Sequence, residues 1–336
     1  MIRSLALTGV LFIILLAFGA ASQPRLDGES RRVPPFHEKS APTYSTFDVK
    51  PPVFASFGAR EAEPSEAANN FLGLGLEAQS VYVFDLSSRR TLFEKNAFEP
   101  RPLASLAKLM TALLAEELIP PSVFVPISVE AVRQEGDSGF MAGEKFKKED
   151  LRDFMLTASS NDAAYAFAEF IGAGIGGEQE AAVLKFAALM NERARELEMF
   201  RTSFLTPHGL DQFVNNQESS GADGTAYEMA LLAEYLYKTH PRILTATRQP
   251  EIKIISEEGR ELGAPNTNRA SGIIPQLIGA KTGFTELAGG NLVFIFDAGF
   301  SRPVLVSLLG SSENGRFKDA KKIVEAVLNY YQNSLE

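Results

Sequence analysis

Two kinds of apolar pattern, separated along the chain, limit what this sequence can fold into. Short β-type runs occur early, at Val81–Leu86 and Thr91–Lys95, and again late, at Asn291–Asp297 and Pro303–Leu309. The residues between them mostly show helical periodicity. Because strands at both ends of a region can pair across it, we expect one antiparallel sheet with an all-helical lobe inserted between its early and late strands. The predicted fold class is therefore α/β, of the α+β kind.

Helical patterns supply the rest of this architecture. The final amphipathic stretch, Arg316–Tyr331, is expected to cover the sheet. A cleft between sheet and lobe is the expected ligand site. The other stretches with helical periodicity are Lys148–Ala158, Asn161–Phe170, Glu178–Leu197 and Thr225–Lys238.

The first 70 residues carry no such pattern. A short positive start is followed by the apolar run Leu5–Ala21 and by small residues, which predicts that residues 1–22 are a signal peptide or an N-terminal membrane anchor. Residues 23–70 are rich in Pro, Ser and Glu without a period, so we predict a disordered linker. The folded domain is expected at 71–336, outside the cytoplasmic membrane.

Composition excludes several classes of function. The chain has 336 residues, 45% of them hydrophobic, which is enough for a substantial core. Its net charge of −9 argues against a nucleic-acid partner. There is no cysteine, and the three histidines show no zinc-site spacing, so a metal-independent mechanism is expected. Nothing in the sequence requires an organic cofactor.

The first candidate motif is Ser105-Leu-Ala-Lys108, at the start of an apolar helical pattern that we expect to begin near Ala104 or Ser105. Lys108 lies one turn after Ser105 on the same face. A hydroxyl and an amine placed in this way can act as nucleophile and base if burial lowers the lysine pKa. Taken alone the pair is ordinary, because Ser commonly caps helices and Lys commonly occurs in them.

Two further motifs follow. Ser159-Ser-Asn161 lies at a break between helical stretches, where both side chains can face one side, although it also reads as a common cap and turn. Lys281-Thr282-Gly283 fits an edge strand that lines the cleft. Its cation and hydroxyl suit a carboxylate, and its glycine allows close approach of a substrate. A solvated edge strand with a protective lysine is the structural alternative.

Together the three motifs form the set found in penicillin-binding proteins and serine β-lactamases. Flanking stretches narrow the resemblance to the D-alanyl-D-alanine carboxypeptidase family, the low-molecular-mass penicillin-binding proteins of serine peptidase family S11, and it covers about Glu77–Tyr331. The flanking stretches are Ala104–Ala112, Ser160–Ala164, Thr206–Asp211, Thr225–Ala230, Asn266–Asn268 and Lys281–Thr285. The resemblance implies a DD-peptidase-like fold and a penicillin-binding catalytic domain at 71–336.

The resemblance also implies roles. Ser105 would attack the D-Ala-D-Ala carbonyl of a peptidoglycan stem peptide and form an acyl-enzyme, and Lys108 would take its proton. Ser159 would relay a proton to the leaving amine, and Asn161 would hold Lys108 and a substrate amide. Lys281 could also be the cation that keeps Lys108 neutral.

The remaining implied roles concern binding. Lys281 and Thr282 would bind the terminal carboxylate, Gly283 would let the substrate approach, and the backbone N–H groups of Ser105 and Phe284 would hold the oxyanion. His208 would lie away from the chemistry. β-Lactam antibiotics are the expected inhibitors.

Two departures from the family pattern bear on function. Phe284 stands where several relatives carry histidine. Many relatives also continue into a second β-rich domain and a C-terminal membrane anchor, whereas this sequence stops after the closing helix, so any anchor is expected in the N-terminal segment. Because relatives of similar length cleave cross-links, the resemblance leaves serine-type carboxypeptidase and endopeptidase activity both open.

Two other classes compete. A class A β-lactamase uses a Glu-x-x-Leu-Asn element between the second and third motifs, whereas here those letters occur only at Glu325–Asn329, after Lys281 and within the predicted last helix. Slow release of bound penicillin is therefore expected. A non-catalytic cell-wall binding protein is disfavoured because the motif residues are intact.

Overall fold

The structure is a computed structural model that describes residues 70–71, 73–175, 181–214, 217–270 and 272–333. All of these lie within one compact unit, Pro42–Glu336. The signal or anchor predicted at 1–22 and nearly all of the linker predicted at 23–70 lie outside the described residues, and both remain predictions. No helix within the described ranges combines the length and the apolar character needed to cross a membrane.

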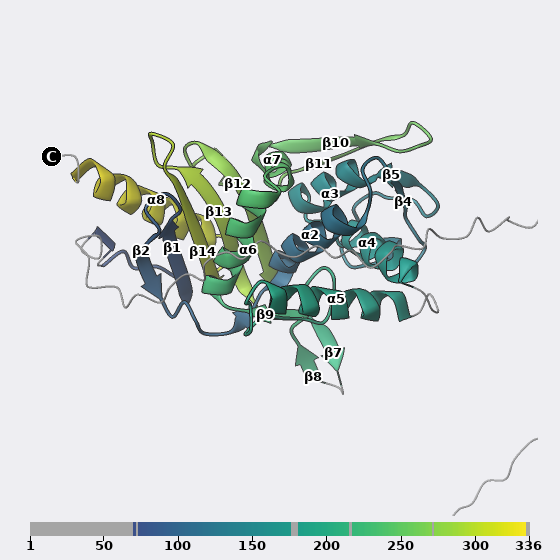
Figure 1. The fold of residues 1–336 in the computed structure, drawn as a ribbon, viewed down its shortest axis with the longest axis horizontal. Coiled ribbons are helices and arrows are strands. Elements are labelled where there is room, and N and C mark those ends of the chain that lie inside the picture. Colours follow the sequence, from purple (N-terminus) through teal and green to yellow (C-terminus); the bar gives the residue numbers. More distant parts are fainter. Residues whose placement is uncertain (1–69, 72, 176–180, 215–216, 271, 334–336) are drawn as a thin grey trace, which may run out of the picture. The chain divides into compact units, whose positions relative to one another are not determined.

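A five-stranded antiparallel sheet joins the two ends of the described region (Figure 1). Its order is β12-β13-β14-β1-β2, so the late strand β14 pairs directly with the first strand β1, with Ser80 opposite Leu309. This confirms the prediction of one sheet built from early and late strands of the chain, with β12 at its edge. The strands are β1 (Ser80–Asp85), β2 (Arg90–Lys95), β12 (Leu277–Thr285), β13 (Gly289–Asp297) and β14 (Pro303–Ser311).

Both faces of this sheet are covered, which explains why its strands read as continuous apolar runs. Val81 and Val83 of β1 pack in the core beneath the closing helix α8 (Gly315–Asn333), together with Phe294 of β13. The alternate residues of the same strands, such as Tyr82 and Ile295, pack instead in the core shared with the helical lobe. The predicted covering helix is thereby confirmed.

The helical lobe lies between β2 and β12 in the sequence, as predicted. The observed helices follow the predicted stretches within a few residues, except that the start predicted at Glu178 lies outside the described residues. They are α2 (Lys108–Leu118), α3 (Lys148–Thr157), α4 (Asn161–Gly174), α5 (Ala182–Glu196) and α6 (Ala226–Thr239). The one-turn helix α7 (Arg242–Thr245) was not predicted. Short 3₁₀ helices are η1 (Ala104–Ala107), η2 (Ala131–Arg133) and η4 (Ala246–Arg248).

Several short strand pairs were not predicted. The most extended is the hairpin of β10 (Glu251–Ile255) and β11 (Glu261–Pro265), which runs beside the lobe in Figure 1 and contacts α3. Pairs of two or three residues give too short an alternation to be recognised as strands. These are β3 (Arg101–Pro102), β6 (Ser203–Phe204) and β9 (Ala222–Gly224) in one sheet, β4 (Phe124–Pro126) with β5 (Lys145–Lys147), and β7 (Gln212–Val214) with β8 (Gln217–Ser219).

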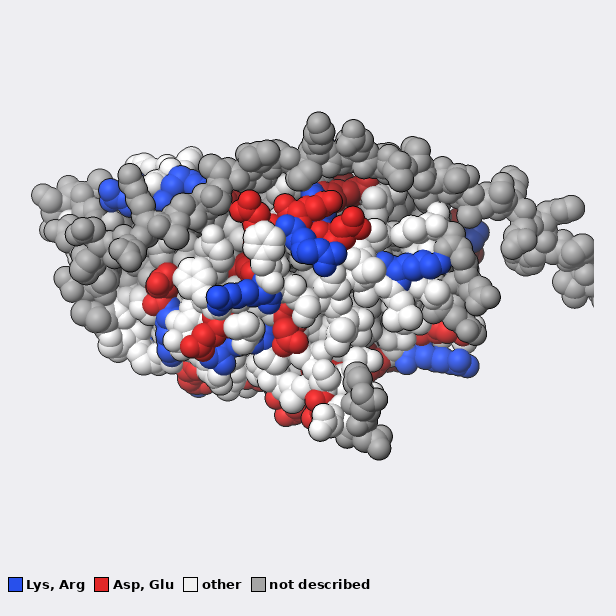
Figure 2. Space-filling model, turned by 60° about the horizontal axis from the view of Figure 1, so that its bottom comes forward, with Lys and Arg blue, Asp and Glu red and all other residues white. Residues whose placement is uncertain are grey.

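The face drawn in Figure 2 carries acidic and basic side chains interspersed rather than gathered by sign. On this face the described residues therefore offer no continuous basic track of the kind that follows a nucleic-acid backbone.

Candidate active site

Ser105 lies in the 3₁₀ turn η1, between β3 and α2. The helix was predicted to begin at this point, and it does so as a tighter turn, a common form at helix N-termini. Ala104, the residue before Ser105, adopts a φ of 48°, and the Leu103 N–H donates to the Ala222 carbonyl at 2.8 Å. Gly209 lies so close that a Cβ there would be 2.0 Å from the Ala104 oxygen. Packing from other segments therefore holds the turn that carries Ser105.

Lys108, one turn later, is fully buried, and its amine contacts three oxygens. Nζ lies 2.8 Å from Ser105 Oγ, 2.7 Å from Asn161 Oδ1 and 3.1 Å from the His208 carbonyl oxygen. The two carbonyl oxygens can only accept hydrogen bonds. A neutral amine has two N–H groups for them, which leaves its lone pair directed to the Ser105 hydroxyl. The arrangement suits removal of the Ser105 proton.

The surroundings of Lys108 favour this neutral amine. Burial lowers the pKa of Lys108 well below its usual range, and the positive charge of Lys281 lowers it further. The carboxyl group of Asp162 acts in the opposite direction, but burial raises the pKa of Asp162 itself to about 6. Desolvation is thus the main reason that this amine can act as a base.

Ser159 and Lys281 form a second hydrogen-bonded group. Lys281 Nζ lies 2.8 Å from Ser159 Oγ and 2.8 Å from the Thr282 carbonyl oxygen. Ser159 adopts a φ of 60° at the end of α3, which turns the chain before Asn161 begins α4. Helix α4 is capped by Ser160, whose hydroxyl accepts from Ala163 N. Ser159 and Asn161 therefore reach different lysines.

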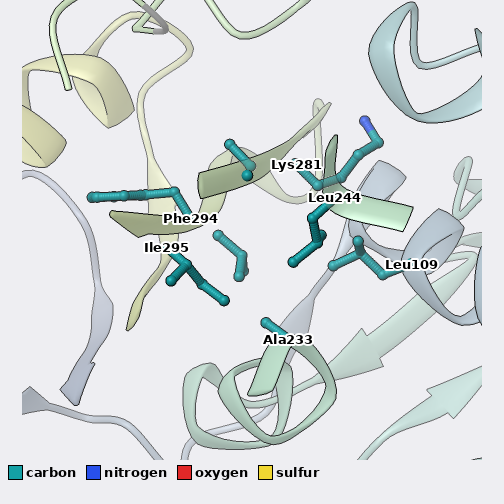
Figure 3. A pocket seen from close by; sticks show the side chains of 9 residues that line it. Leu109, Ala233, Leu244, Lys281, Phe294 and Ile295 are labelled. Atoms are coloured by element: carbon teal, nitrogen blue, oxygen red, sulfur yellow. The ribbon is translucent and has the colours of Figure 1, made fainter. Parts of the chain in front are cut away.

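The stem of Lys281 crosses an apolar region behind strand β12. A void of about 10 Å³, too small for more than one water, is lined there by Leu109, Leu244 and Ile295 among others. Figure 3 shows the Lys281 amine extending away from these side chains. Burial, together with the charge of Arg316, lowers the pKa of Lys281 to about 7. Near neutral pH this lysine therefore titrates.

The remainder of the third motif lines the same edge. Thr282 Oγ1 lies 2.7 Å from Thr267 Oγ1. Gly283 faces the nucleophile turn, since a Cβ there would be 3.3 Å from Ser105 N, and its carbonyl accepts from Arg316 Nη1 at 2.6 Å. Phe284, at the end of β12, has 40% of its surface exposed. Strand β12 thus runs directly beside the turn of Ser105.

The structure adds contacts that sequence reasoning missed. The Glu135 carbonyl accepts from Asn161 Nδ2 at 2.6 Å, and Thr267 pairs with Thr282. His208, expected away from the chemistry, lies beside it through its backbone, since its carbonyl accepts from Lys108. Its buried ring accepts from Leu210 N and contacts Gln134 Oε1, and burial lowers the pKa of His208 to about 3. A backbone acceptor leaves no mark in side-chain identity, so the sequence could not reveal this role.

Two features bear on the alternative functions, namely the Glu-x-x-Leu-Asn letters and a metal site. Glu325, which begins the Glu-x-x-Leu-Asn letters, lies in α8 as predicted, with its side chain 59% exposed and 3.8 Å from Lys321. In the part of the chain that the structure describes, no three potential metal ligands among His, Asp and Glu gather in one place.

Comparison with known proteins places this geometry in context. Residues 65–310 match the family model Peptidase_S11, described as D-alanyl-D-alanine carboxypeptidase. Carboxypeptidase DacF of Bacillus subtilis is 30% identical over 265 residues, covering 77% of this chain and 64% of that protein. DacC of Escherichia coli is 28% identical over 272 residues, covering 76% and 62%. The chain thus spans less than two thirds of the length of these curated relatives.

Solved structures agree with the fold. Penicillin-binding protein D2 of Listeria monocytogenes, solved with ampicillin bound, is 31% identical and has a TM-score of 0.59, covering 75% of this chain and 98% of that one. A variant of the Streptomyces K15 DD-transpeptidase has a TM-score of 0.66 at 23% identity, covering 76% of this chain and 98% of that one. The second likeness concerns the fold alone.

Proposed function

Because this chain belongs to the D-alanyl-D-alanine carboxypeptidase family, we propose that it is a serine-type peptidase that removes the terminal D-Ala from peptidoglycan stem peptides. The observation that supports this most directly is the buried Lys108 amine, 2.8 Å from Ser105 Oγ, with two carbonyl oxygens occupying its N–H groups. This constellation provides a nucleophile and a base in contact.

The proposed reaction has two halves. Ser105 Oγ attacks the carbonyl carbon between the two D-Ala residues while its proton passes to Lys108 Nζ. The C–N bond then breaks, the departing amine takes up a proton, and D-Ala leaves from an acyl-enzyme ester. Ser159, bonded to Lys281, relays to this amine the proton that Lys108 took from Ser105. Water hydrolyses the ester and frees Ser105. No cofactor enters either half.

The binding roles follow from position on β12. Lys281 supplies a cation and Thr282 a hydroxyl for the terminal carboxylate of the substrate. Gly283 leaves room for the substrate backbone beside Ser105, and the N–H groups of Ser105 and Phe284 stabilise the oxyanion. Loss of one oxyanion donor typically lowers the rate about 10²–10³-fold. Asn161 keeps Lys108 in place and can bind a substrate amide.

Location and inhibitors follow from the same proposal. Peptidoglycan lies outside the cytoplasmic membrane, so we place the domain there, exported or held by its N-terminal segment. The Listeria relative was solved with ampicillin bound, and we expect β-lactams to acylate Ser105 here as well.

The test is acylation by a fluorescent penicillin. The full-length chain and a Ser105→Ala variant are incubated with the label and separated on a denaturing gel. We expect a stable covalent label on the parent chain only, and a rate about 10²–10⁴-fold lower for Lys108→Ala. An unlabelled, folded parent would favour the non-catalytic binding protein, and rapid release of the label would favour a β-lactamase.

Substrate choice needs a second measurement. Mass spectrometry of products from a pentapeptide muropeptide and from a cross-linked dimer separates carboxypeptidase from endopeptidase activity. Release of D-Ala from the pentapeptide alone supports the proposal, whereas cleavage of the dimer alone replaces it with endopeptidase activity.

A further inference from the structure

One exposed loop, which we call the Gln134–Met141 segment, supplies partners to the site without forming regular structure after η2. Gln134 Oε1 contacts the His208 ring, and the Glu135 carbonyl accepts from Asn161 Nδ2. Ser138 Oγ donates to Ser160 Oγ, the cap of α4, at 2.8 Å. Three parts of the site therefore depend on where this segment lies.

The segment has little of its own to fix it. Gly136 and Gly139 adopt φ values of 87° and 78°, and most of its residues are exposed. Glycine-containing loops of this kind lose much conformational freedom when they are ordered. The buried ring of Phe140, edge-on against Phe146 and Phe154, anchors its C-terminal end, and Ser138 hydrogen-bonds to the carboxyl group of Asp162 in α4.

A second anchor at the same end comes from the turn of the β10–β11 hairpin. Arg260 forms a two-pronged contact with Glu144, through Nε to Oε1 and through Nη2 to Oε2 at 2.5 Å. The same Nη2 donates to the Gly139 carbonyl at 3.0 Å, and Glu144 Oε2 accepts from Met141 N at 2.8 Å. One guanidinium and one carboxylate therefore bind the end of the Gln134–Met141 segment at two backbone positions.

The hairpin itself is tied to the opposite wall of the site. Beyond β11, Thr267 N donates to the Thr157 carbonyl at 3.0 Å, and Thr267 Oγ1 pairs with Thr282 Oγ1. Arg260 thus lies on the hairpin that leads to the third motif and grips the segment that holds Asn161. Because Asn161 in turn contacts Lys108, the Arg260–Glu144 pair is connected to the base through the segment and this amide.

We propose that Arg260 and Glu144 are positioning residues, which hold the Gln134–Met141 segment so that Asn161 keeps the Lys108 amine aligned with Ser105. The inference deepens the proposed function and rests on it. The geometry favours arginine specifically, because a planar guanidinium can bridge a carboxylate and a carbonyl at once, which a point-charged lysine cannot.

The expected signature is a slower chemical step in a folded protein. The Arg260 side chain is 32% exposed but that of Glu144 only 9%, so loss of either partner should lower stability by a modest amount. Small misplacements of a reacting group, by contrast, lower rates strongly. We expect Arg260→Gln and Glu144→Gln each to lower the first-order acylation constant of the full-length chain about tenfold, with the penicillin dissociation constant nearly unchanged and both proteins still folded at the assay temperature.

Matched variants sharpen the test. Glu257 lies in the same hairpin turn and pairs with Lys145 at 2.9 Å, but this pair does not touch the Gln134–Met141 segment. Glu257→Gln should acylate at the parent rate. The Arg260→Gln/Glu144→Gln double variant should lose no more than either single variant, because both remove one interaction. Arg260→Lys should recover only part of the rate.

Stopped-flow acylation with a fluorescent penicillin, across a range of concentrations, separates the binding and chemical steps. Equal acylation constants for the parent and for both Gln variants would overturn the inference while leaving the proposed function intact. An equal loss of acylation rate in the control variant Glu257→Gln would also overturn the inference. A parent that takes no label overturns the proposed function, and the inference with it.

Discussion

At the scale of single residues, the proposed reaction needs opposite protonation states in two buried lysines of the site. Lys108 acts as a neutral base, with its pKa lowered by burial and then by Lys281. Lys281 binds a carboxylate as a cation, yet burial and Arg316 lower its pKa to about 7. The proposed activity should therefore need a pH above the pKa of Lys108, so that this amine is neutral, and below that of Lys281, so that this one is charged.

The pH profile should show the upper bound. Lys281 loses its proton as the pH rises through about 7, so kcat/KM for a pentapeptide should fall above that value in the free enzyme. A Lys281→Arg variant keeps its charge, and its falling limb should move to higher pH. A substrate with an amidated C-terminus should lack this limb. A kcat/KM for the pentapeptide that rises steadily from pH 7 to about pH 9 would contradict the assignment.

The same lysine should reduce the stability of the fold. Its pKa lies near 7 when folded and at 10.5 in an unperturbed chain, so the unfolded state holds more protons between these values and stability rises with pH across this window. Lys281→Met should therefore raise the free energy of unfolding by about 1–2 kcal/mol at pH 7. Urea unfolding at about pH 7 and about pH 9.5 measures this, and the gain should be smaller at the higher pH. A less stable variant at pH 7 would refute the prediction.

Residue identity revealed the side chains of the site but not their surroundings. Every side chain in these hydrogen bonds except Thr267 was a candidate from sequence. The structure places them in three groups, which are Ser105 with Lys108 and Asn161, Ser159 with Lys281, and Thr282 with Thr267. The carbonyls of Glu135 and His208 could not be found, because a backbone acceptor is the same in every residue. Their importance depends on tertiary placement alone.

At the scale of elements, long periodic patterns were predictable and short connections were not. The strands of the sheet and the main helices follow their apolar periods, because burial of a whole face fixes them. The β10–β11 hairpin was missed because the alternation of Ile252 and Ile254 with polar residues is short and is broken by Ile255. Its proposed positioning role depends on the contacts that Arg260, in its turn, makes with Gly139 and Glu144.

The turn at Gly209 illustrates an element held by close approach. Gly209 has a φ of 79°, and a Cβ there would lie 2.0 Å from the Ala104 oxygen. Gly209→Ala should lower stability by about 2–3 kcal/mol and slow penicillin acylation, because it pushes on the turn of Ser105. Thermal unfolding and acylation rates measure both effects.

A control for this substitution is available at Gly75. It also has a positive φ, of 56°, but a Cβ added there would meet no atom within 4 Å apart from its chain neighbours. Gly75→Ala should therefore bear only the backbone strain and should acylate at the parent rate. Equal acylation defects in the two variants would show that the Gly209 contact does not govern the site.

At the scale of the whole molecule, Asp319 of α8 joins the segment just before β1 to the end of β14. Its buried carboxylate accepts from Glu77 N at 3.0 Å, Ala78 N at 2.7 Å and Ser311 Oγ at 2.9 Å. Asp319→Ala leaves these donors without their partner and should lower the free energy of unfolding by about 3 kcal/mol. Denaturant unfolding measures the loss.

This substitution should spare the chemistry. Asp319 contacts none of the candidate site residues in the bonds described above, so the folded Asp319→Ala protein should acylate as the parent does. Asp319→Asn keeps one acceptor oxygen and should be intermediate in stability. A strong acylation defect with full stability would show that α8 acts on the site rather than on the fold.

The pairing of β1 with β14 affects when the site can form during synthesis of the chain. A ribosome completes Ser105 and Lys108 long before it reaches β12, and β1 waits for a partner as distant as Leu309. Contacts so far apart in sequence form slowly. Until β12 is made, the chain has the proposed nucleophile but lacks Lys281, the proposed carboxylate ligand, whose charge also lowers the pKa of Lys108. The proposed reactivity is therefore expected only after β12 has been synthesised and has joined the sheet.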